Sequence, residues 1–329
     1  CGMQRFKNIL AVVEITQSSS LALERAVSLA ESNQASLTVI SVVPRLTSEV
    51  SEIEASSLTA EFQKYAVNEQ QKKLGALLSP YRQQLEIKFK ILVGTPFLEI
   101  VKEVLRNGHD LVVKMSEDPD WLDRLFGSND MHLLRKCPCP VWLIKSQEEQ
   151  RYKRILAAVD FDDDHLPDDF EAEKALNLQI LEMAGSMALA DSADLHIVHV
   201  WDAVDEELFN AFSMEHVEED KINRYAEANR RRHTDKLNSL ISYVEREGMG
   251  EVLKYLKPRK HLLKGSARKE VPLLAKSINA DLIVMGTVAR TGISGFFIGN
   301  TAEMILNQIN CSVLAIKPPG FVTPVTLEK

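Results

Sequence analysis

Residues 151–160 read RYKRILAAVD, and residues 5–14 read RFKNILAVVE. The two segments share Arg, Lys, Ile, Leu, Ala and Val at corresponding places. Both have the continuous apolar character that is typical of a central strand in a parallel sheet. A strand pattern that returns half a chain later indicates that one structural unit is present twice.

Further landmarks repeat in the same order, each with similar residues: 94–100 with 265–271, 110–113 with 281–284, and 139–145 with 311–317. We therefore expect two copies of one domain, residues 1–148 and 149–329, joined by a charged linker near residues 146–150. The second copy carries a helical insertion at residues 202–249.

Within the first copy, apolar strand patterns alternate with helical ones. Strands are expected at 5–14, 36–43, 86–93, 110–115 and 140–145, and helices after 18–20 and at about 57–83, 96–107 and 128–136. This alternation predicts an α/β fold: two doubly wound parallel sheets with right-handed crossovers and helices on both faces.

Composition narrows the class of partner. The chain has 329 residues, which suits two α/β domains, and a net charge of −8. An acidic chain is a poor match for nucleic acid or an anionic membrane surface, so we expect neither as a partner. The visible sequence has no apolar run of the ~20 residues that span a bilayer and no secretory signal. We expect a cytoplasmic protein whose cysteines, which form no CxxC motif, are reduced thiols.

The strongest candidate site is residues 286–303, GTVARTGISGFFIGNTAE, which follow the apolar strand Leu282–Met285. Glycine at a strand exit and at a helix entrance lets the backbone pass close to a phosphate, and the first amides of a helix favour an anion. Arg290 lies between Gly286 and Gly299. The pattern is typical of a phosphate-binding loop.

These residues resemble the tandem type of the universal stress protein family. The resemblance covers essentially residues 5–317 and is most specific in ILAAVD, in residues 286–303 and in CSVLAIKP. It implies the family fold, a five-stranded parallel sheet of order 3-2-1-4-5 that is Rossmann-like and of the adenine nucleotide alpha hydrolase-like type. Nucleotide-binding members carry G-x2-G-x9-G-[ST] after strand four and an Asp at the end of strand one. Carried onto this chain, the resemblance implies ATP or another adenine nucleotide bound by Asp160, Met285, Gly286, Thr287, Arg290, Gly299, Asn300 and Thr301.

The chain departs from the family pattern in two places of the second copy and more widely in the first. Ala289 stands where the motif has its second glycine, and Asn300 where it has Ser or Thr. In the first copy strand one ends in Glu14, and strand four exits into Lys114-Met115 followed by acidic residues. We predict that the first copy is structural and does not bind ATP. The resemblance further implies that residues 140–145 and 311–317 meet in an internal pseudo-dimer, which leaves a homodimer open.

Other functions remain as alternatives to a non-catalytic nucleotide-binding protein with at most weak ATPase activity. Asp160 and Asp162 fit the pattern of an aspartyl-nucleophile phosphatase, although the loop after strand four lacks the acidic residues that would hold magnesium. A ligand-free interaction module is a second alternative. A third is a carrier of an apolar or amphipathic ligand under residues 202–249, which contain Phe209, Phe212 and Met214. His196 and His199 lie three residues apart on one strand and should point to opposite faces, so no metal is predicted there.

Overall fold

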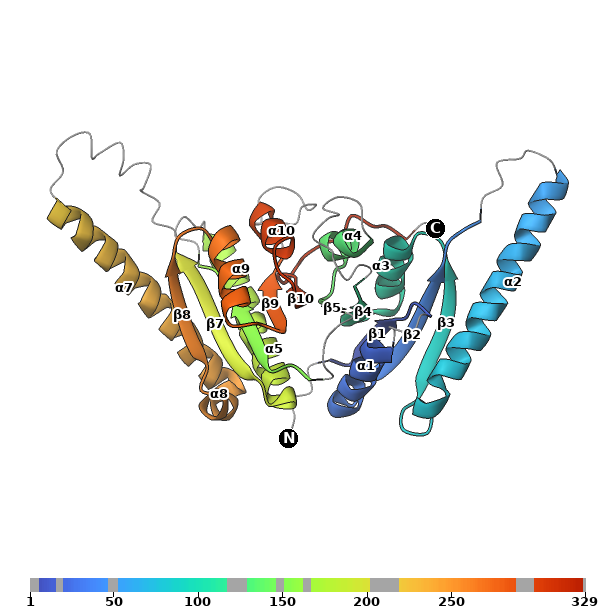
Figure 1. Cartoon of the computed structure of the whole chain (residues 1–329), viewed down its shortest axis with the longest axis horizontal. Helices are drawn as coiled ribbons and strands as arrows, with labels where there is room; N and C mark the ends of the chain where they lie inside the picture. The colour runs from blue at the N-terminus through green and yellow to red at the C-terminus, as the bar shows by residue number, and fades with distance from the viewer. Residues whose placement is uncertain are drawn as a thin grey trace.

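The protein is described by a computed structural model that covers residues 6–15, 20–46, 53–116, 129–145, 151–161, 167–201, 219–287 and 299–327. Figure 1 shows two α/β halves side by side, with the long helices α2 and α7 at opposite ends. The first half contains β1 (Asn8–Val12), α1 (Ser20–Asn33), β2 (Ser36–Val43), α2 (Ile53–Leu78), β3 (Ile87–Val93), α3 (Pro96–Asn107), β4 (Leu111–Met115), α4 (Asn129–Lys136) and β5 (Val141–Ile144).

The second half repeats this order. It contains β6 (Arg154–Ala158), α5 (Pro167–Asp191), β7 (Asp194–Trp201), α7 (Glu219–Val244), a π-helical turn (Glu245–Met249), α8 (Gly250–Leu256), β8 (Arg259–Lys264), α9 (Ala267–Ser277), β9 (Leu282–Gly286), α10 (Asn300–Leu306) and β10 (Ser312–Ile316). Helix α7 follows the second strand of its half as α2 does, and both are 26 residues long. Within residues 202–249, α7 is therefore the counterpart of α2, and Phe209, Phe212 and Met214 lie outside the described residues.

All strands join one sheet of order β3-β2-β1-β4-β5-β10-β9-β6-β7-β8. Each half has the predicted order 3-2-1-4-5, with its strands parallel. The registers also correspond, because Val12 pairs with Lys114 in the first half and Ala158 with Met285 in the second. Lys114 and Met285 therefore occupy equivalent places, next to the carboxyl end of the first strand of their half.

The halves meet where β5 and β10 pair antiparallel, with Trp142 opposite Leu314. The predicted pairing of the two last strands is confirmed, and the sheet continues across the boundary. Beside it, the Trp142 indole donates to the Tyr152 hydroxyl at 3.0 Å, and the Arg25 guanidinium stacks 3.8 Å from the centre of the Tyr152 ring. Arg25 also bonds Asp191 at 3.1 Å, which ties α1 of one half to α5 of the other.

Two apolar cores cover the two faces of the sheet. Helices α1, α2, α5 and α7 pack on one face, and α3, α4, α9 and α10 on the other. The predicted apolar face of α7 is buried against the first core through Leu237, Leu240, Ile241 and Val244. Helices thus cover both faces of the sheet, and in α/β sheets of this kind ligands bind beyond the carboxyl ends of the strands.

Candidate functional site

The carboxyl ends of β6 and β9 are neighbours, because Ala158 pairs with Met285. Asp160, two residues beyond β6, therefore lies near Gly286, the last residue of β9. We call this part of the sheet the second-half edge and define it by Asp160, Gly286, Thr287 and residues 299–301. Arg290 falls outside the described residues, as do its neighbours 288–298.

Asp160 is held by its backbone, and its side chain is exposed. The buried Asn177 on α5 forms both of the holding bonds. Its amide oxygen accepts from the Asp160 backbone N–H at 3.1 Å, and its amide nitrogen donates to the Asp160 carbonyl at 2.6 Å. These two bonds fix the backbone of Asp160 at the edge of the sheet. Nothing in the sequence singled out Asn177, because it is one polar residue within a long helix.

Gly286 packs closely against α5 of its own half. A Cβ added at this position would lie 2.9 Å from Cδ2 of Leu176 on α5, which is closer than real Cβ contacts. The preceding Met285 is buried in the core on the opposite face. The missing side chain of Gly286 therefore leaves room for Leu176 of α5 at the end of β9.

Thr287 is fully buried and joins the two ends of the loop. Its carbonyl accepts from the Gly299 backbone N–H at 3.1 Å, and its own N–H donates to the Ile316 carbonyl at 3.2 Å. Its hydroxyl accepts from the Lys317 ammonium at 2.7 Å. Thr287 thus fixes the position at which the loop leaves the sheet and returns to α10.

Lys317, which sequence reasoning did not consider, connects this loop to the first half. Its ammonium also donates to the Leu134 carbonyl on α4. Burial lowers the pKa of Lys317 to about 8, against the opposing effect of the nearby Cys137 and Cys139. The lysine is therefore held at an energetic cost where the two halves and the loop meet.

Asn300 and Thr301 begin α10, and both are exposed. The first intrahelical bond of α10 runs from the Glu303 N–H to the Gly299 carbonyl at 2.9 Å. Backbone N–H groups in the first turn of a helix have no partner within the helix, so those of Asn300 and Thr301 suit an anion.

The first half fills the equivalent place with its own charges. Lys114 is only 2% exposed, and its ammonium lies 3.0 Å from Glu14 and 3.1 Å from Asp130. It also donates to the Met115 carbonyl at 3.0 Å. We call the side chains of Lys114, Glu14 and Asp130 the Lys114 cluster. The corresponding residues of the second half are Met285, Asp160 and Ala302, so that half has no lysine at the Lys114 position.

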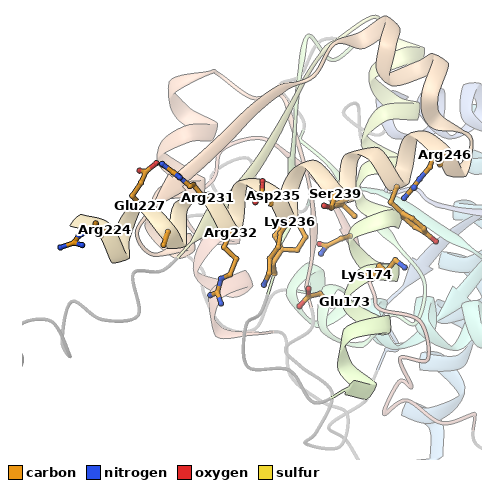
Figure 2. A pocket seen from close by; sticks show the side chains of 15 residues that line it. Glu173, Lys174, Arg224, Glu227, Arg231, Arg232, Asp235, Lys236, Ser239 and Arg246 are labelled. Atoms are coloured by element: carbon orange, nitrogen blue, oxygen red, sulfur yellow. The ribbon is translucent and has the colours of Figure 1, made fainter. Parts of the chain in front are cut away.

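A cavity of about 950 Å³ lies between α5 and α7, next to the Asp160 anchor. Its floor includes Phe161, Asn177, Leu240 and Tyr243. Figure 2 shows charged side chains along α7 on one wall, with Glu173 and Lys174 of α5 on the other. The basic residues of the lining are Lys174, Arg224, Arg231, Arg232, Lys236 and Arg246, and the acidic ones are Glu173, Glu227 and Asp235.

The histidines of β7 pair with different elements. His199 is 2.9 Å from His233 on α7, and His196 is 2.9 Å from His261 on β8, as expected for side chains on opposite faces. Among the described residues, no three His, Cys, Asp or Glu side chains are grouped as a metal site would need. Asp162, proposed as the acid and base of a phosphatase, lies outside the described residues.

The doubled 3-2-1-4-5 sheet with an open carboxyl edge defines a tandem α/β protein of the Rossmann-like class. The model of the universal stress protein family matches residues 5–145 and 151–317, and the chain belongs to that family. Universal stress protein E of Escherichia coli (strain K12) is 35% identical over 245 residues, which cover 74% of this chain and 72% of that protein.

Two further comparisons cover nearly the whole chain. Universal stress protein E of Photorhabdus laumondii is 27% identical and covers 99% of this chain and 100% of its own length. A crystal structure of a universal stress protein from Pseudomonas aeruginosa is 25% identical, with a TM-score of 0.61 and coverage of 96% and 95%. In the described chain, no helix has the length and apolar character that crossing a membrane requires.

Proposed function

We propose that the second half binds an adenine nucleotide, or another phosphate-bearing ligand, at the second-half edge. The first half is a structural partner, and the chain is a stress-response protein with at most slow ATPase activity. ATP is the first ligand to test. A cytoplasmic location and a homodimer stay predictions.

The observation that carries this proposal is the difference between the two edges. At the first-half edge a buried cation lies between two carboxylates, so the charges at that position are already balanced within the protein. The second-half edge has Met285 in that place and an exposed carboxylate at Asp160. An exposed acceptor beside the start of a helix matches a ribose or base on one side and phosphates on the other.

The proposed roles follow from the contacts of each residue. Asp160 accepts from the sugar or base, and the N–H groups of Asn300 and Thr301 bind phosphate, with the Thr301 hydroxyl beside them. Arg290 adds a positive charge. Because the Thr287 hydroxyl and the Gly299 N–H are bonded within the protein, Met285, Gly286, Thr287 and Gly299 shape the edge for the ligand.

The test is to copy the Lys114 cluster into the second half. We expect the double variant Met285→Lys/Ala302→Asp to lose ATP binding in isothermal titration calorimetry, because the new lysine pairs with Asp160 and the new aspartate. Met285→Leu is the matched control and should bind like the wild type. The proposal fails if wild-type protein binds no nucleotide, or if the double variant folds and binds ATP unchanged.

The cavity between α5 and α7 supports a second candidate function, a carrier of an amphipathic anion. Its aromatic and aliphatic floor suits an apolar group, and its walls carry more basic than acidic side chains. A purely apolar ligand is a poor match for these walls, because it would leave charged groups desolvated. Native mass spectrometry of the purified protein should then show an added mass that organic extraction removes.

A variant pair separates this function from nucleotide binding. Arg232→Glu/Lys236→Glu reverses two charges on the cavity wall, as Figure 2 shows for these side chains. Arg230→Glu changes the same helix at a residue that does not line the cavity. The carrier function predicts loss of the added mass in the first variant only. An unliganded wild-type protein that also binds no nucleotide would leave the interaction module as the better function.

A further inference from the structure

Two of the three described cysteines lie in a short turn between α4 and β5, with the sequence Cys137-Pro138-Cys139-Pro140. The chain bends at Pro138 and Cys139, which brings the two cysteine side chains together. The Sγ atoms of Cys137 and Cys139 are 3.6 Å apart. The turn thus holds two thiols in contact.

The two thiols have unequal acidity. Burial by itself raises the pKa of Cys137, but the thiol and backbone N–H of Cys139 and the ammonium of Lys317 together bring it below its usual value. The hydrogen bond with Cys137 and burial raise the pKa of Cys139 well above its usual value. One sulfur is therefore favoured as a thiolate nucleophile while the other keeps its proton, as in dithiols that form disulfides reversibly.

We propose that Cys137 and Cys139 are a redox-active dithiol, oxidised to a disulfide by hydrogen peroxide and restored by a small dithiol reductant. The Cys137 thiolate attacks one peroxide oxygen, the O–O bond breaks, and a sulfenic acid and, after protonation, one water are formed. The Cys139 sulfur then attacks the Cys137 sulfur, the S–O bond breaks, and the thiol proton leaves with the hydroxyl as a second water. Two electrons pass from the two sulfurs to one peroxide.

Burial decides which oxidant is suitable. Cys137 is fully buried and Cys139 is 8% exposed, so the reactive pair lies just beneath the surface. A molecule as small as hydrogen peroxide suits this site, whereas attack by a protein thiol would require the turn to open. The reductant must likewise be small.

The second half contains an internal control. Cys311 precedes β10 as Cys139 precedes β5, and it is also buried, but Ile309 occupies the place that corresponds to Cys137. Cys311 therefore reports what peroxide does to a buried thiol of this fold that lacks a neighbouring cysteine two residues earlier.

The test uses the reduced full-length protein. After exposure to hydrogen peroxide, the protein is quenched, denatured, alkylated with N-ethylmaleimide and digested with trypsin. In the peptide Cys137–Lys145, neither cysteine should then carry an alkyl group, and the peptide should be two hydrogens lighter than its reduced, unalkylated form. Cys311 should stay alkylated. Dithiothreitol before alkylation should restore the doubly alkylated peptide. A Cys137–Lys145 peptide that stays fully alkylated, or is oxidised no faster than Cys311, overturns the proposal.

Two variants test the order of the steps. Cys139→Ser should leave a sulfenic acid on Cys137 that a cyclic 1,3-dione traps, and Cys137→Ser should leave Cys139 as unreactive as Cys311. Circular dichroism checks that both variants fold, and the wild-type peptide measurement does not depend on either. Trapping on Cys139 instead of Cys137 would contradict the assigned nucleophile.

Discussion

The two halves share one fold but treat the same position in opposite ways. In the first half Lys114 is buried between Glu14 and Asp130, and in the second the equivalent residues are Met285, Asp160 and Ala302. A buried cation needs its carboxylates, and a buried methionine needs none. The two copies of the scaffold thus differ in whether the chain itself places opposite charges at this position.

A second contrast concerns the lysine that directly follows the last strand of each half. Lys145 follows β5 and lies nearer the solvent, where its ammonium contacts Asn310. Lys317 follows β10 and is buried, bonded to Thr287 and to Leu134 of the other half. The symmetry of the two halves is therefore broken at their boundary as well as at their edges.

The largest effect is expected at the Lys114 cluster. Lys114→Met copies the second half but leaves Asp130, which is 3% exposed, without its cation. Breaking a buried pair in this way should cost roughly 3–5 kcal/mol in the free energy of unfolding, measured by urea denaturation. Adding Asp130→Ala gives the first half the same methionine and alanine as the second half. This double variant should recover most of the lost free energy of unfolding. A double variant as unstable as the single one would show that the cluster stabilises by packing alone.

The next comparison is the pH dependence of the two lysines. Burial lowers the folded-state pKa of Lys317 to about 8, below its ordinary 10.5. Below pH 8 the lysine is protonated in both states, and the full penalty for burying the charge is present. Between pH 8 and 10.5 the unfolded state binds more protons, so this lysine makes stability rise with pH, by up to about 3 kcal/mol.

Urea denaturation of wild type and Lys317→Met between pH 7 and 10 measures this contribution. The variant should lack the rise, so the free energy of unfolding of the wild type minus that of the variant should increase with pH. Lys145→Met is the matched control, because it removes the corresponding lysine from a place nearer the solvent. Parallel curves for wild type and Lys317→Met would contradict the buried charge.

A smaller effect is expected at Gly286, whose counterpart in the first half is Met115. Gly286→Ala places a Cβ against Leu176 and should destabilise the protein by about 1–3 kcal/mol, by urea denaturation. Leu176→Val in the same chain should recover part of the loss if the clash is the cause. If Gly286→Ala also weakens ATP binding and Leu176→Val restores both stability and affinity, Gly286 acts on the ligand through packing.

The sequence was sufficient for the scaffold and for the neighbourhood of its edge. Repeated apolar strands predicted the doubled sheet, and the meeting of residues 140–145 with 311–317 followed from the family resemblance and is confirmed. Strand order then brings Asp160 beside Gly286 without further information, since the carboxyl ends of β6 and β9 are neighbours.

The residues that hold the edge together could not be predicted in the same way. Asn177 reaches back to Asp160, Lys317 to Thr287, and Lys114 to Glu14, across 17, 30 and 100 positions of the chain. Such contacts depend on where one side chain points after the sheet has formed, and no local pattern records that direction. The charged lining of the cavity was missed for a related reason. The run Arg230–Arg232, among glutamates on a helix, is typical of a solvated face, and only the packing of α7 beside α5 places Arg231 and Arg232 on the cavity wall.

The smallest predicted effect compares the two acidic residues that end the first strand of each half. Asp160→Ala should weaken ATP binding about tenfold, equivalent to about 1.4 kcal/mol, because one acceptor for the sugar or base is removed from an exposed position. Glu14→Ala should leave ATP affinity unchanged, since Glu14 faces Lys114 in a half that we expect to bind no nucleotide. Isothermal titration calorimetry of both variants measures this directly. Equal losses would mean that the two edges bind alike, and a loss confined to Glu14→Ala would assign the nucleotide to the first half.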